Sequence, residues 1–383
     1  MTREQAAEFV RELVQAINAH DARRMLSFYD DSAVAHTPAF PTIAGRAAIG
    51  ENFETLFSLF PDWAVELKDL LVDGDRIAFT GTVRATDRNG WFGQAPTGER
   101  IEYRAIIVLK IANGKIIHDE RIYDLAGVLQ RLEKSRLDRE LRMAAEVQRA
   151  LLPRSTFQTS FCQAVADSIP CRTIGGDFFD ITQLPSGSIG MALGDVAGKG
   201  PASALLASML QGMLAAVVEK ESSPAYVVRA LNGLLIRRGL QPSFVTLFYG
   251  VLSPEGELAY ANAGHIPPML LTDGKIRRLT AGGPVLGLMP QSAFEEETLS
   301  LREGDTLTAF SDGVSEARNF EDREFGEDAL ISCVSASGRA GVREMLNRIL
   351  ASVREFCQGA SQADDITAMV VRFQHLREKH PPF

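Results

Sequence analysis

The sequence GGDFFD occupies residues 175–180, and GDVAGKG follows at residues 194–200. Two further acidic stretches lie downstream, SDG at residues 311–313 and DDIT at residues 364–367. Each stretch places a carboxylate beside glycine or next to an apolar run that predicts a strand. Because aspartate and glycine are common turn residues, each stretch alone is compatible with an ordinary loop. Together they indicate a chain that brings several carboxylates to the ends of its strands.

The aspartates of these stretches define a candidate metal site, formed by Asp177, Asp195, Asp312 and Asp364. Strand ends in packed sheets can converge, and four carboxylates there would repel one another unless cations neutralised them. Oxygen ligands without histidine or thiolate favour Mg²⁺ or Mn²⁺, and neighbouring glycines let backbone carbonyls and waters approach. Two ions that share one carboxylate lower the pKa of a bound water and orient it for attack on phosphorus. The arrangement therefore predicts hydrolysis of a phosphate ester.

The sequence lacks the complete motifs of other phosphate-binding and hydrolytic sites. The sequence contains neither a Gly-x-Ser-x-Gly stretch nor a Gly-x-x-x-x-Gly-Lys-Ser/Thr loop. One rival matches by spacing, because Cys333 and Arg339 form the Cys-x₅-Arg string of a cysteine-phosphatase loop. That string holds a single glycine, no histidine precedes it and no clear strand leads into it. We interpret the spacing as coincidence.

The ordered motifs resemble the metal-dependent protein phosphatase family, and within it the bacterial branch typified by RsbU and the sporulation phosphatase. The resemblance rests on seven blocks: GGDFFD, GDVAGKG, FVTLFYGVL, NAGHIPP, GPVLGL, SDG and DDIT. It implies an α-β-β-α sandwich and a phosphoserine/phosphothreonine protein phosphatase that uses two Mn²⁺ or Mg²⁺ ions. By the same resemblance, the four aspartates are catalytic metal ligands, Asp195 bridges the ions, and the Val196 carbonyl is a backbone ligand.

Three further residues lie within or beside these blocks. Asp365 follows Asp364 and is expected to hold the metal ligands in position without binding a metal ion itself. His265, in NAGHIPP, is either a general acid or a turn histidine bonded to the backbone. Lys199 is either a phosphate ligand or a solvated side chain. No arginine clamp for phosphate is evident, so the ions are expected to do most of the phosphate binding.

Length and charge set the broad class of the protein. At roughly 100–200 residues per domain, 383 residues predict two or three domains. The net charge of −9 disfavours nucleic acid and anionic membranes as partners. The longest apolar run, residues 204–218, is interrupted by Gln211 and predicts a buried core helix instead of a membrane span. Without an apolar run at the N-terminus, we expect a cytoplasmic protein, and the four scattered cysteines predict core residues and not disulfides.

The first 125 residues predict a separate α+β domain. Apolar residues at helical spacing predict a helix over residues 3–19, and Asp21 begins a second short helix that extends to Tyr29. Strand-like runs follow, and they cover Ala64–Val72, Arg76–Arg84, Ile101–Ile111 and Lys115–Tyr123. The Asp-Gly and Asn-Gly turns between them are typical of hairpins.

This domain resembles the SnoaL-like polyketide cyclases of the nuclear transport factor 2-like superfamily. The similar stretches are AHDARRMLSFYDDSAV (19–34), FPDW (60–63), PTGERI (96–101) and YDLAGVLQRL (123–132). The resemblance implies a cone of helices on a curved sheet around an apolar cavity, with Asp124 as acid/base and His36 and Asp87 as candidate lining residues. The usual histidine before Pro96 is absent. We therefore favour binding of a small apolar ligand, or dimerisation, over cyclase activity.

Residues 126–153 predict one long helix between the two domains. Its apolar residues form two stripes whose phase shifts near Ser135. The first stripe holds Leu125, Leu129 and Leu132, and the second holds Leu137, Leu141, Ala144 and Leu151. Such a helix pairs with a second copy as a coiled coil or packs on its own domain. We favour the coiled coil and a homodimer.

The sequence thus predicts an α+β protein of four segments: a SnoaL-like sensor or dimerisation domain (1–125), a helical linker (126–153), a phosphatase domain (154–375) and a tail (376–383). By the resemblance, the substrate is a phosphorylated anti-sigma-factor antagonist in a partner-switching system. The N-terminal domain is expected to regulate the phosphatase through the linker, by shifting an equilibrium between two states. Two alternatives stay open: a non-catalytic scaffold that binds phosphoprotein, and a small-molecule cyclase or isomerase in the N-terminal domain.

Overall fold

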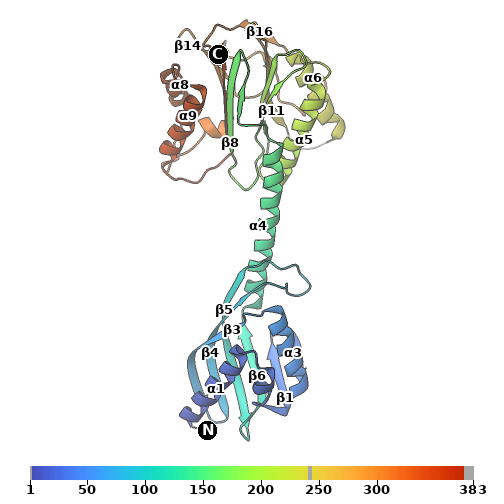
Figure 1. Cartoon of the computed structure of the whole chain (residues 1–383), viewed down its shortest axis with the longest axis vertical. Coiled ribbons are helices and arrows are strands. Elements are labelled where there is room, and N and C mark those ends of the chain that lie inside the picture. Colours follow the sequence, from blue (N-terminus) through green and yellow to red (C-terminus); the bar gives the residue numbers. More distant parts are fainter. Residues whose placement is uncertain (1, 240–243, 375–383) are drawn as a thin grey trace, which may run out of the picture. The chain divides into compact units, whose positions relative to one another are not determined.

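A computed structural model describes residues 2–239 and 244–374 of the chain, and Figure 1 shows its elements in chain order. These residues divide into two units between Glu140 and Leu141. Helix α4 (Leu125–Leu151) contributes residues to both units. The finer boundaries after residues 125 and 153, which isolate this helix, stay a prediction. The predicted tail, residues 376–383, lies outside the described residues.

The first unit combines short helices with a single sheet. Its helices before α4 are α1 (Arg3–Asn18), α2 (Ala22–Leu26) and α3 (Arg46–Leu59). Its strands are β1 (Tyr29–Thr37), β2 (Phe40–Ala44), β3 (Ala64–Asp73), β4 (Arg76–Thr86), β5 (Arg100–Ala112) and β6 (Lys115–Tyr123). Thr2 caps α1 in a reciprocal box with Gln5, and Asp21 caps α2, as its position in the sequence predicts.

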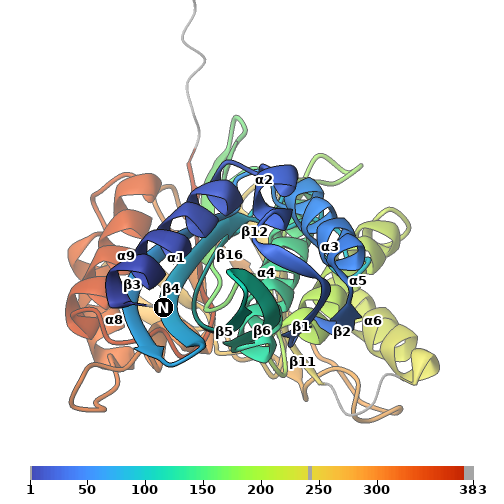
Figure 2. The same ribbon diagram turned by 90° about the horizontal axis from the view of Figure 1, so that it is seen from below.

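The sheet has the strand order β2-β1-β6-β5-β4-β3, and β1 runs parallel to β6. Helix α1 packs against β3 and α3 against β1, and Figure 2 shows both helices beside the curved sheet. Leu13 and Met25 from the helices share one core with Phe79 and Leu109 from the sheet. This is the α+β arrangement that the SnoaL-like resemblance implies.

The sequence does not predict β1, β2 or α3. The alternation of β1 is broken by a register irregularity between Tyr29 and Val34. Helix α3 has no side-chain cap and carries Gly50 in its interior, both of which weaken a helical pattern. A Cβ atom at Gly50 would lie 2.7 Å from a methyl carbon of Leu26, so a larger residue there would require the Leu26 side chain to move.

Helix α4 uses different faces along its length. Val128 and Leu132 are buried in the core of the first unit, whereas Ala145 packs with Ile174 and Ala204 in the second unit. Four large apolar side chains of α4 are exposed in this chain: Leu137, Met143, Val147 and Leu151. Of the predicted second stripe, only Leu141 packs against its own unit.

The second unit contains two sheets and the helices that cover them. Its strands are β7 (Thr156–Gln158), β8 (Cys162–Ile169), β9 (Phe178–Gln183), β10 (Ile189–Val196), β11 (Val245–Leu252), β12 (Glu257–Ala263), β13 (Met269–Thr272), β14 (Lys275–Arg278), β15 (Gly282–Gly283), β16 (Glu297–Ser300), β17 (Thr306–Phe310) and β18 (Ile366–Phe373). Its further helices are α5 (Pro201–Val218), α6 (Pro224–Arg238), α7 (Asp312–Ser315), α8 (Glu327–Ala336) and α9 (Val342–Cys357). The sequence does not predict the short elements β7, β14–β16, α7 and α8, nor β8 and β9.

The two sheets stack face to face. One has the order β15-β12-β11-β10-β9, with β16 also paired to β12, and the other has the order β14-β13-β17-β18-β8-β7. An apolar layer that includes Phe179, Met191, Leu307 and Met369 joins them. Helices α5 and α6 cover the outer face of the first sheet and α8 and α9 that of the second, as Figure 1 shows. The unit is therefore an α-β-β-α sandwich, as predicted.

Helix α5 is, among the described residues, the one helix long and apolar enough to cross a membrane, with 18 residues and a mean hydropathy of 1.6. Its buried face, which includes Leu210 and Leu214, packs on the sheet and on α6. Gln211 is buried as well, and its side-chain amide donates to the Phe179 carbonyl at 3.3 Å. Within this unit α5 is a core helix, which confirms that prediction.

Candidate active site

Asp177 and Asp195 lie at the same end of the first sheet. Asp177 directly precedes β9, whose first residue Phe178 pairs with Gly194 of β10, and Asp195 follows Gly194 in that strand. Antiparallel pairing places the start of one strand beside the end of its neighbour. Asp177 is 5% exposed and Asp195 is half-buried. The sheet therefore positions both carboxylates on rigid backbone.

Asp312 and Asp364 occupy the corresponding place in the second sheet. Phe310, the last residue of β17, pairs with Ala368 of β18. Asp312 opens α7 just after β17, and Asp364 is separated from β18 by a single residue. The Ser311 hydroxyl donates to the Asp365 carbonyl at 3.1 Å and so ties the two loops together.

Electrostatic repulsion links the four carboxylates. Burial raises the pKa of Asp195 to about 7, and the negative charges of Asp312 and Asp364 contribute to the increase. Burial, followed by the charge of Asp195, raises the pKa of Asp177 well above its usual range. Burial, followed by Asp364, also raises the pKa of Asp312. The fold thus holds negative charges close enough to oppose the ionisation of Asp177, Asp195 and Asp312, and a divalent cation would relieve that repulsion.

The donor set fits hard divalent cations. The Oδ2 atom of Asp177 is buried and has no hydrogen-bond partner among the described residues. The Val196 carbonyl oxygen lies beside Gly176, where a Cβ atom would meet it at 2.9 Å. Glycine therefore keeps the space next to that oxygen open. Carboxylate and carbonyl oxygens are the ligands that Mg²⁺ and Mn²⁺ prefer.

Asp365 positions the loop that carries Asp177. Its Oδ1 accepts a hydrogen bond from the Cys171 amide at 2.7 Å. Its Oδ2 accepts from the amides of Gly176 at 2.7 Å and Asp177 at 3.3 Å. Both carboxylate oxygens are thus committed to backbone groups, and the side chain is 5% exposed.

Two motif glycines are required by their closeness to Asp365. A Cβ atom on Gly175 would lie 2.5 Å from the Asp365 Oδ2 atom. A Cβ atom on Gly313 would lie 2.0 Å from the Asp365 carbonyl oxygen. The glycines of GGD and SDG therefore allow both loops to pack directly on the DDIT segment.

Lys199 lies at the rim of the site. Its Nζ atom is 2.7 Å from the Asp364 Oδ2 atom and donates to the Ala363 carbonyl at 2.5 Å. The hydrogen bond with Asp364 raises the pKa of Lys199, so the side chain stays cationic. A positive charge in this place attracts an incoming phosphate.

His265 is part of a turn and is held there by Thr246 and Asn262. Its Nδ1 atom bonds with the Thr246 hydroxyl at 2.8 Å, and its backbone amide donates to the Asn262 Oδ1 atom at 2.7 Å. The Asn262 side chain donates back to the His265 carbonyl at 2.9 Å. Burial lowers the pKa of His265 to about 4, so the ring is neutral at neutral pH. The geometry favours the turn role over the general-acid role.

The rival cysteine-phosphatase interpretation is excluded by the fold. Cys333 lies inside α8, and its Sγ atom is 3.8 Å from the Ser352 hydroxyl of α9. Backbone amides within a helix are engaged in its own hydrogen bonds and cannot form a phosphate-binding loop. The Cys-x₅-Arg spacing is therefore coincidental.

Cys171 and Arg172 lie beside the site, although no motif marks them in the sequence. The Cys171 sulfur is within 4.8 Å of carboxylate oxygens of Asp364 and Asp365. Burial, with the charge of Asp365, raises the pKa of this thiol to about 11, so it is uncharged at neutral pH. The Arg172 guanidinium is near Gly200, where a Cβ atom would lie 3.8 Å from its Nη1 atom. This arginine is a candidate phosphate contact that the sequence pattern does not reveal.

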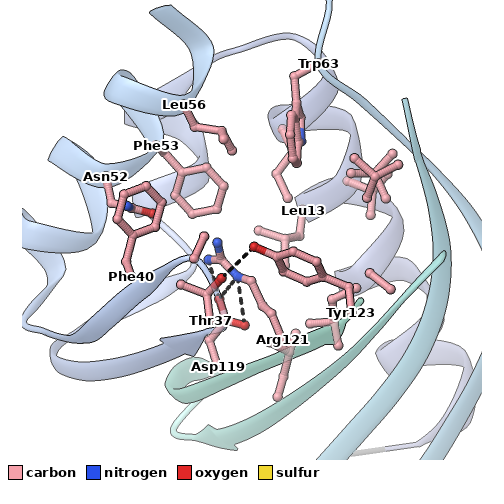
Figure 3. Close-up of a pocket in the computed structure, with 18 of the residues that line it drawn as sticks. Leu13, Thr37, Phe40, Asn52, Phe53, Leu56, Trp63, Asp119, Arg121 and Tyr123 are labelled. Atoms are coloured by element: carbon pink, nitrogen blue, oxygen red, sulfur yellow. Dashed lines mark hydrogen bonds and ion pairs between the residues drawn. The ribbon is translucent and has the colours of Figure 1, made fainter. Parts of the chain in front are cut away.

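The first unit contains a small cavity with aromatic walls, shown in Figure 3. Its volume is about 80 Å³. The aromatic lining residues are Tyr29, Phe40, Phe53, Trp63, Phe79, Trp91, Tyr103 and Tyr123. The size and lining fit a small, largely apolar ligand.

A buried ion pair forms the polar end of this cavity. The Arg121 Nη2 atom lies 2.6 Å from the Asp119 Oδ2 atom, which also accepts from the Tyr29 hydroxyl at 2.7 Å. The Arg121 guanidinium is 4.5 Å from the centre of the Phe53 ring, and Figure 3 shows both side chains in the cavity wall. Burial alone would lower the pKa of Arg121, but Asp119 more than offsets it and the net pKa is raised. The arginine therefore stays charged.

Asp124 and Asp87 do not line the cavity, contrary to prediction. Asp124 precedes α4 and accepts from the Gly127 amide at 2.8 Å, so its carboxylate caps that helix. Asp87 is buried and accepts from the Thr97 amide and hydroxyl at 2.9 and 2.7 Å. Asp124 is thus a capping residue, and Asp87 is a loop-stabilising one.

His36 is also absent from the cavity lining. Neighbouring side chains of a strand point to opposite faces of the sheet. Thr37 lines the cavity, so His36 points to the other face of β1. It lies there beside His118 and Glu120 of β6.

Known protein families match both units. Residues 185–374 match the family described as Stage II sporulation protein E (SpoIIE). The second unit is a SpoIIE-type phosphatase domain. Residues 10–118 match the SnoaL-like domain family, so the first unit is a SnoaL-like domain. Phosphatases of the SpoIIE family depend on metal ions, which agrees with the carboxylate cluster of the SpoIIE-type domain.

Curated proteins and solved structures are similar to the chain, and three of them illustrate the extent of the likeness. Protein IcfG of Synechocystis sp. is 29% identical over 262 residues, which are 61% of this chain and 41% of IcfG. Phosphoserine phosphatase RsbU of Bacillus subtilis is 29% identical over 251 residues, 65% of this chain and 72% of RsbU. The SiaA-PP2C domain of Pseudomonas aeruginosa has a TM-score of 0.56 at 19% identity and covers 63% of this chain and 99% of that domain. The chain spans less than half of IcfG, and the likeness to SiaA shows that the SpoIIE-type domain shares its fold.

Proposed function

We propose that the SpoIIE-type domain hydrolyses phosphoserine or phosphothreonine on a protein partner. The observation that carries the proposal is the convergence of Asp177, Asp195, Asp312 and Asp364 at the ends of the two sheets. Burial and neighbouring negative charges raise the pKa values of the first three. The similarity to RsbU, named a phosphoserine phosphatase, supports the choice of substrate group. The thiol of Cys171 stays protonated at neutral pH and is a poor nucleophile.

Each residue of the site has a role in this proposal. The four aspartates and the Val196 carbonyl would hold two Mn²⁺ or Mg²⁺ ions, and Asp195 is the proposed common ligand. When bound, these ions supply a water of lowered pKa and neutralise the phosphate ester. Lys199 adds positive charge at the rim, and Asp365 holds the backbone on which Asp177 is presented. His265 is assigned no proton transfer, because it is neutral and bonded to Thr246.

We infer that the substrate is a small phosphorylated regulatory protein of the anti-sigma-factor antagonist class. The inference rests on the similarity to RsbU and to the SpoIIE family. A pocket of about 350 Å³ adjoins Asp364, and Lys199, Arg318 and Arg354 are among its lining residues. Three cations around an open pocket suit a phosphorylated segment of a partner protein.

We infer further that the SnoaL-like domain regulates the phosphatase through α4. The Gln148 side chain of α4 donates to the Gly175 carbonyl at 2.7 Å and accepts from the Gly175 amide at 3.3 Å. Since Gly175 belongs to the loop that carries Asp177, a small rotation of α4 would displace a proposed metal ligand. The cavity around Arg121 offers a place for a small ligand to act. A cyclase function is not favoured, because Asp124 caps a helix outside the cavity.

The activity should require a divalent cation. We expect the full-length chain to release phosphate from a phosphoserine peptide with Mn²⁺ or Mg²⁺, to stop when the ion is removed by a chelator, and to recover when it is restored. The reason is that the site holds carboxylates and no activated nucleophile of its own. A colorimetric phosphate assay measures the release, and a phosphotyrosine peptide of the same sequence is the control. Tight binding of the phosphopeptide without release under every metal condition would instead support the scaffold alternative.

The exposed apolar side chains of α4 should form a homodimer interface. Leu137, Ala144 and Leu151 recur every seven residues, and Val147 falls between the last two at coiled-coil spacing. We expect Val147→Glu to convert a dimer to a monomer, because it places a charge in the apolar seam. Light scattering coupled to size exclusion measures the mass. If the monomeric variant and the dimeric wild type differ in phosphatase rate by about fivefold or more, the result would support control through α4.

Arg142→Glu is the matched control for this interface. Arg142 is exposed on α4 but lies off the apolar stripe, so this charge change should leave the mass unaltered. A wild-type chain that is monomeric at micromolar concentration would show the coiled-coil proposal to be wrong.

A further inference from the structure

A second cluster of metal-binding side chains lies in the SnoaL-like domain. Histidine is scarce, with six residues in the chain, yet the ring centroids of His36 and His118 lie 5.0 Å apart. Glu120 joins them, and one ligand atom from each of the three side chains lies within 4.8 Å of the others. All three residues are half-buried.

Strand pairing explains why these residues meet. β1 and β6 are parallel neighbours, with Val34 opposite His118 and His36 opposite Glu120. Residues two apart on a strand share a face, so the pairing gathers all three donors on one side of the sheet. Asp119 and Arg121 alternate with them on β6 and line the cavity on the other side. The cluster is therefore separate from the cavity.

Two hydrogen bonds already orient the cluster. The Thr42 hydroxyl lies 3.1 Å from the Nδ1 atom of His36, which leaves the Nε2 atom available. The Nε2 atom of His118 lies 3.3 Å from the Glu120 Oε2 atom. In metal sites, a polar partner on the far ring nitrogen commonly fixes the orientation of a ligating imidazole.

Two cations on neighbouring strand positions, Lys110 and Arg121, are engaged elsewhere. Lys110 of β5 is opposite His118, but its ammonium group lies 3.8 Å from the carboxylate of Asp75. Arg121 is on the cavity side and pairs with Asp119. A cation bound between the imidazoles would therefore meet the negative charge of Glu120, and neither Lys110 nor Arg121 would be free to compete with it.

We propose that His36, His118 and Glu120 bind a divalent transition metal, with Zn²⁺ as the best-suited ion. Two imidazoles and one carboxylate are a typical Zn²⁺ ligand set and leave a fourth position for water. Oxygen-only sites, in contrast, favour Mg²⁺ and Mn²⁺. The ion would join β1 to β6 close to their register irregularity between Tyr29 and Val34, and so stabilise the SnoaL-like domain.

The test uses the full-length chain without a histidine tag, in excess Mg²⁺ so that carboxylate sites are occupied. We expect calorimetric titration to show Zn²⁺ bound at one equivalent per chain and lost in His36→Ala and His118→Ala, with affinity reduced at least about 100-fold. Thr42→Val should weaken binding about tenfold, because it frees the His36 ring. Co²⁺ in place of Zn²⁺ should give the visible absorption of a four-coordinate site in the wild type and not in His118→Ala.

Two controls keep the result interpretable. Glu102→Gln removes an exposed carboxylate of β5 that pairs with Arg84 outside the cluster, and it should bind Zn²⁺ like the wild type. Glu120→Gln preserves the shape of the side chain and gives a binding result even if a histidine variant folds poorly. Thermal melts without metal establish which variants are folded.

Three outcomes would overturn the proposal. The first is a wild-type chain that binds no Zn²⁺ at micromolar concentration. The second is unchanged affinity in both histidine variants. The third is Zn²⁺ binding that is lost in Asp195→Asn but kept in His118→Ala, which would place the ion in the phosphatase carboxylates. Since none of the three measures phosphate release, the proposal stands or fails independently of the phosphatase activity.

Discussion

Asp195→Asn should lower kcat/KM for a phosphoserine peptide by at least about a thousandfold. The substitution keeps the shape of the side chain but removes the negative charge that the proposed site shares between two ions. The charges of both Asp312 and Asp364 raise the pKa of Asp195, so its carboxylate lies close to those of the second sheet. Steady-state phosphate release at saturating Mn²⁺ measures the effect.

The same substitution should stabilise the metal-free protein. In the folded chain, burial and the neighbouring aspartates raise the pKa of Asp195 from 3.8 to about 7. Between these two pH values the unfolded chain releases its proton more readily than the folded chain, so the free energy of unfolding falls as the pH rises. Urea titrations in chelator should show that decline in the wild type and a smaller one in Asp195→Asn.

Asp167→Asn is the matched control for both measurements. Asp167 is an exposed carboxylate of β8 in the same domain, and its removal should leave the rate and the pH dependence as they are. If Asp195→Asn instead kept its rate to within about tenfold, the assignment of Asp195 as the shared ligand would be wrong.

Asp365→Ala should cost both stability and activity. Three backbone amides, those of Cys171, Gly176 and Asp177, lose their acceptor. Leaving such buried donors unpaired lowers the free energy of unfolding by about 2–4 kcal/mol. The loop that carries Asp177 would then be free to move, so we expect the Mn²⁺ concentration for half-maximal activity to rise by about tenfold or more.

Asp365→Asn separates these two consequences. Its remaining carbonyl oxygen can serve only part of the amide set, so we expect a smaller loss of stability and a partial rescue of Mn²⁺ affinity. Saturating Mn²⁺ should restore much of the rate in both variants, because Asp365 positions a ligand and is not itself assigned to an ion. An Asp365→Ala chain as stable as the wild type, with unchanged Mn²⁺ dependence, would contradict the positioning role.

The residues of the candidate site are easier to predict from the sequence than most of the structure around them. Aspartates beside glycines mark the places where backbone must pass closely, as Gly313 does at the carbonyl of Asp365. Glycine and strand-end positions are local features that a linear pattern records. The long elements, such as α5 and β18, are visible for the same reason, since their apolar runs are continuous.

Residues brought together by strand register are not visible in this way. In the sequence, Asp119 and Arg121 look like an ordinary exposed ion pair. Only the structure shows that alternate residues of β6 point into an aromatic cavity. Cys171 lies near Asp364 only because β8 and β18 are neighbours. His36 is assigned to the wrong face, because β1 itself is not predicted and the facing of a strand depends on its register.

The alternation of β6 makes the pairing of β1 and β6 resistant to error during folding. If β6 slipped by one residue, His118 and Glu120 would turn into the aromatic cavity, while Asp119 and Arg121 would lose their enclosure. The slipped register would bury polar side chains without partners. It would also expose the Asp119–Arg121 ion pair, which in the correct register contacts Tyr29 and Phe53. A slip of β6 would therefore raise the free energy of the fold on both faces of the sheet. This cost favours one register, even beside the irregularity at the start of β1.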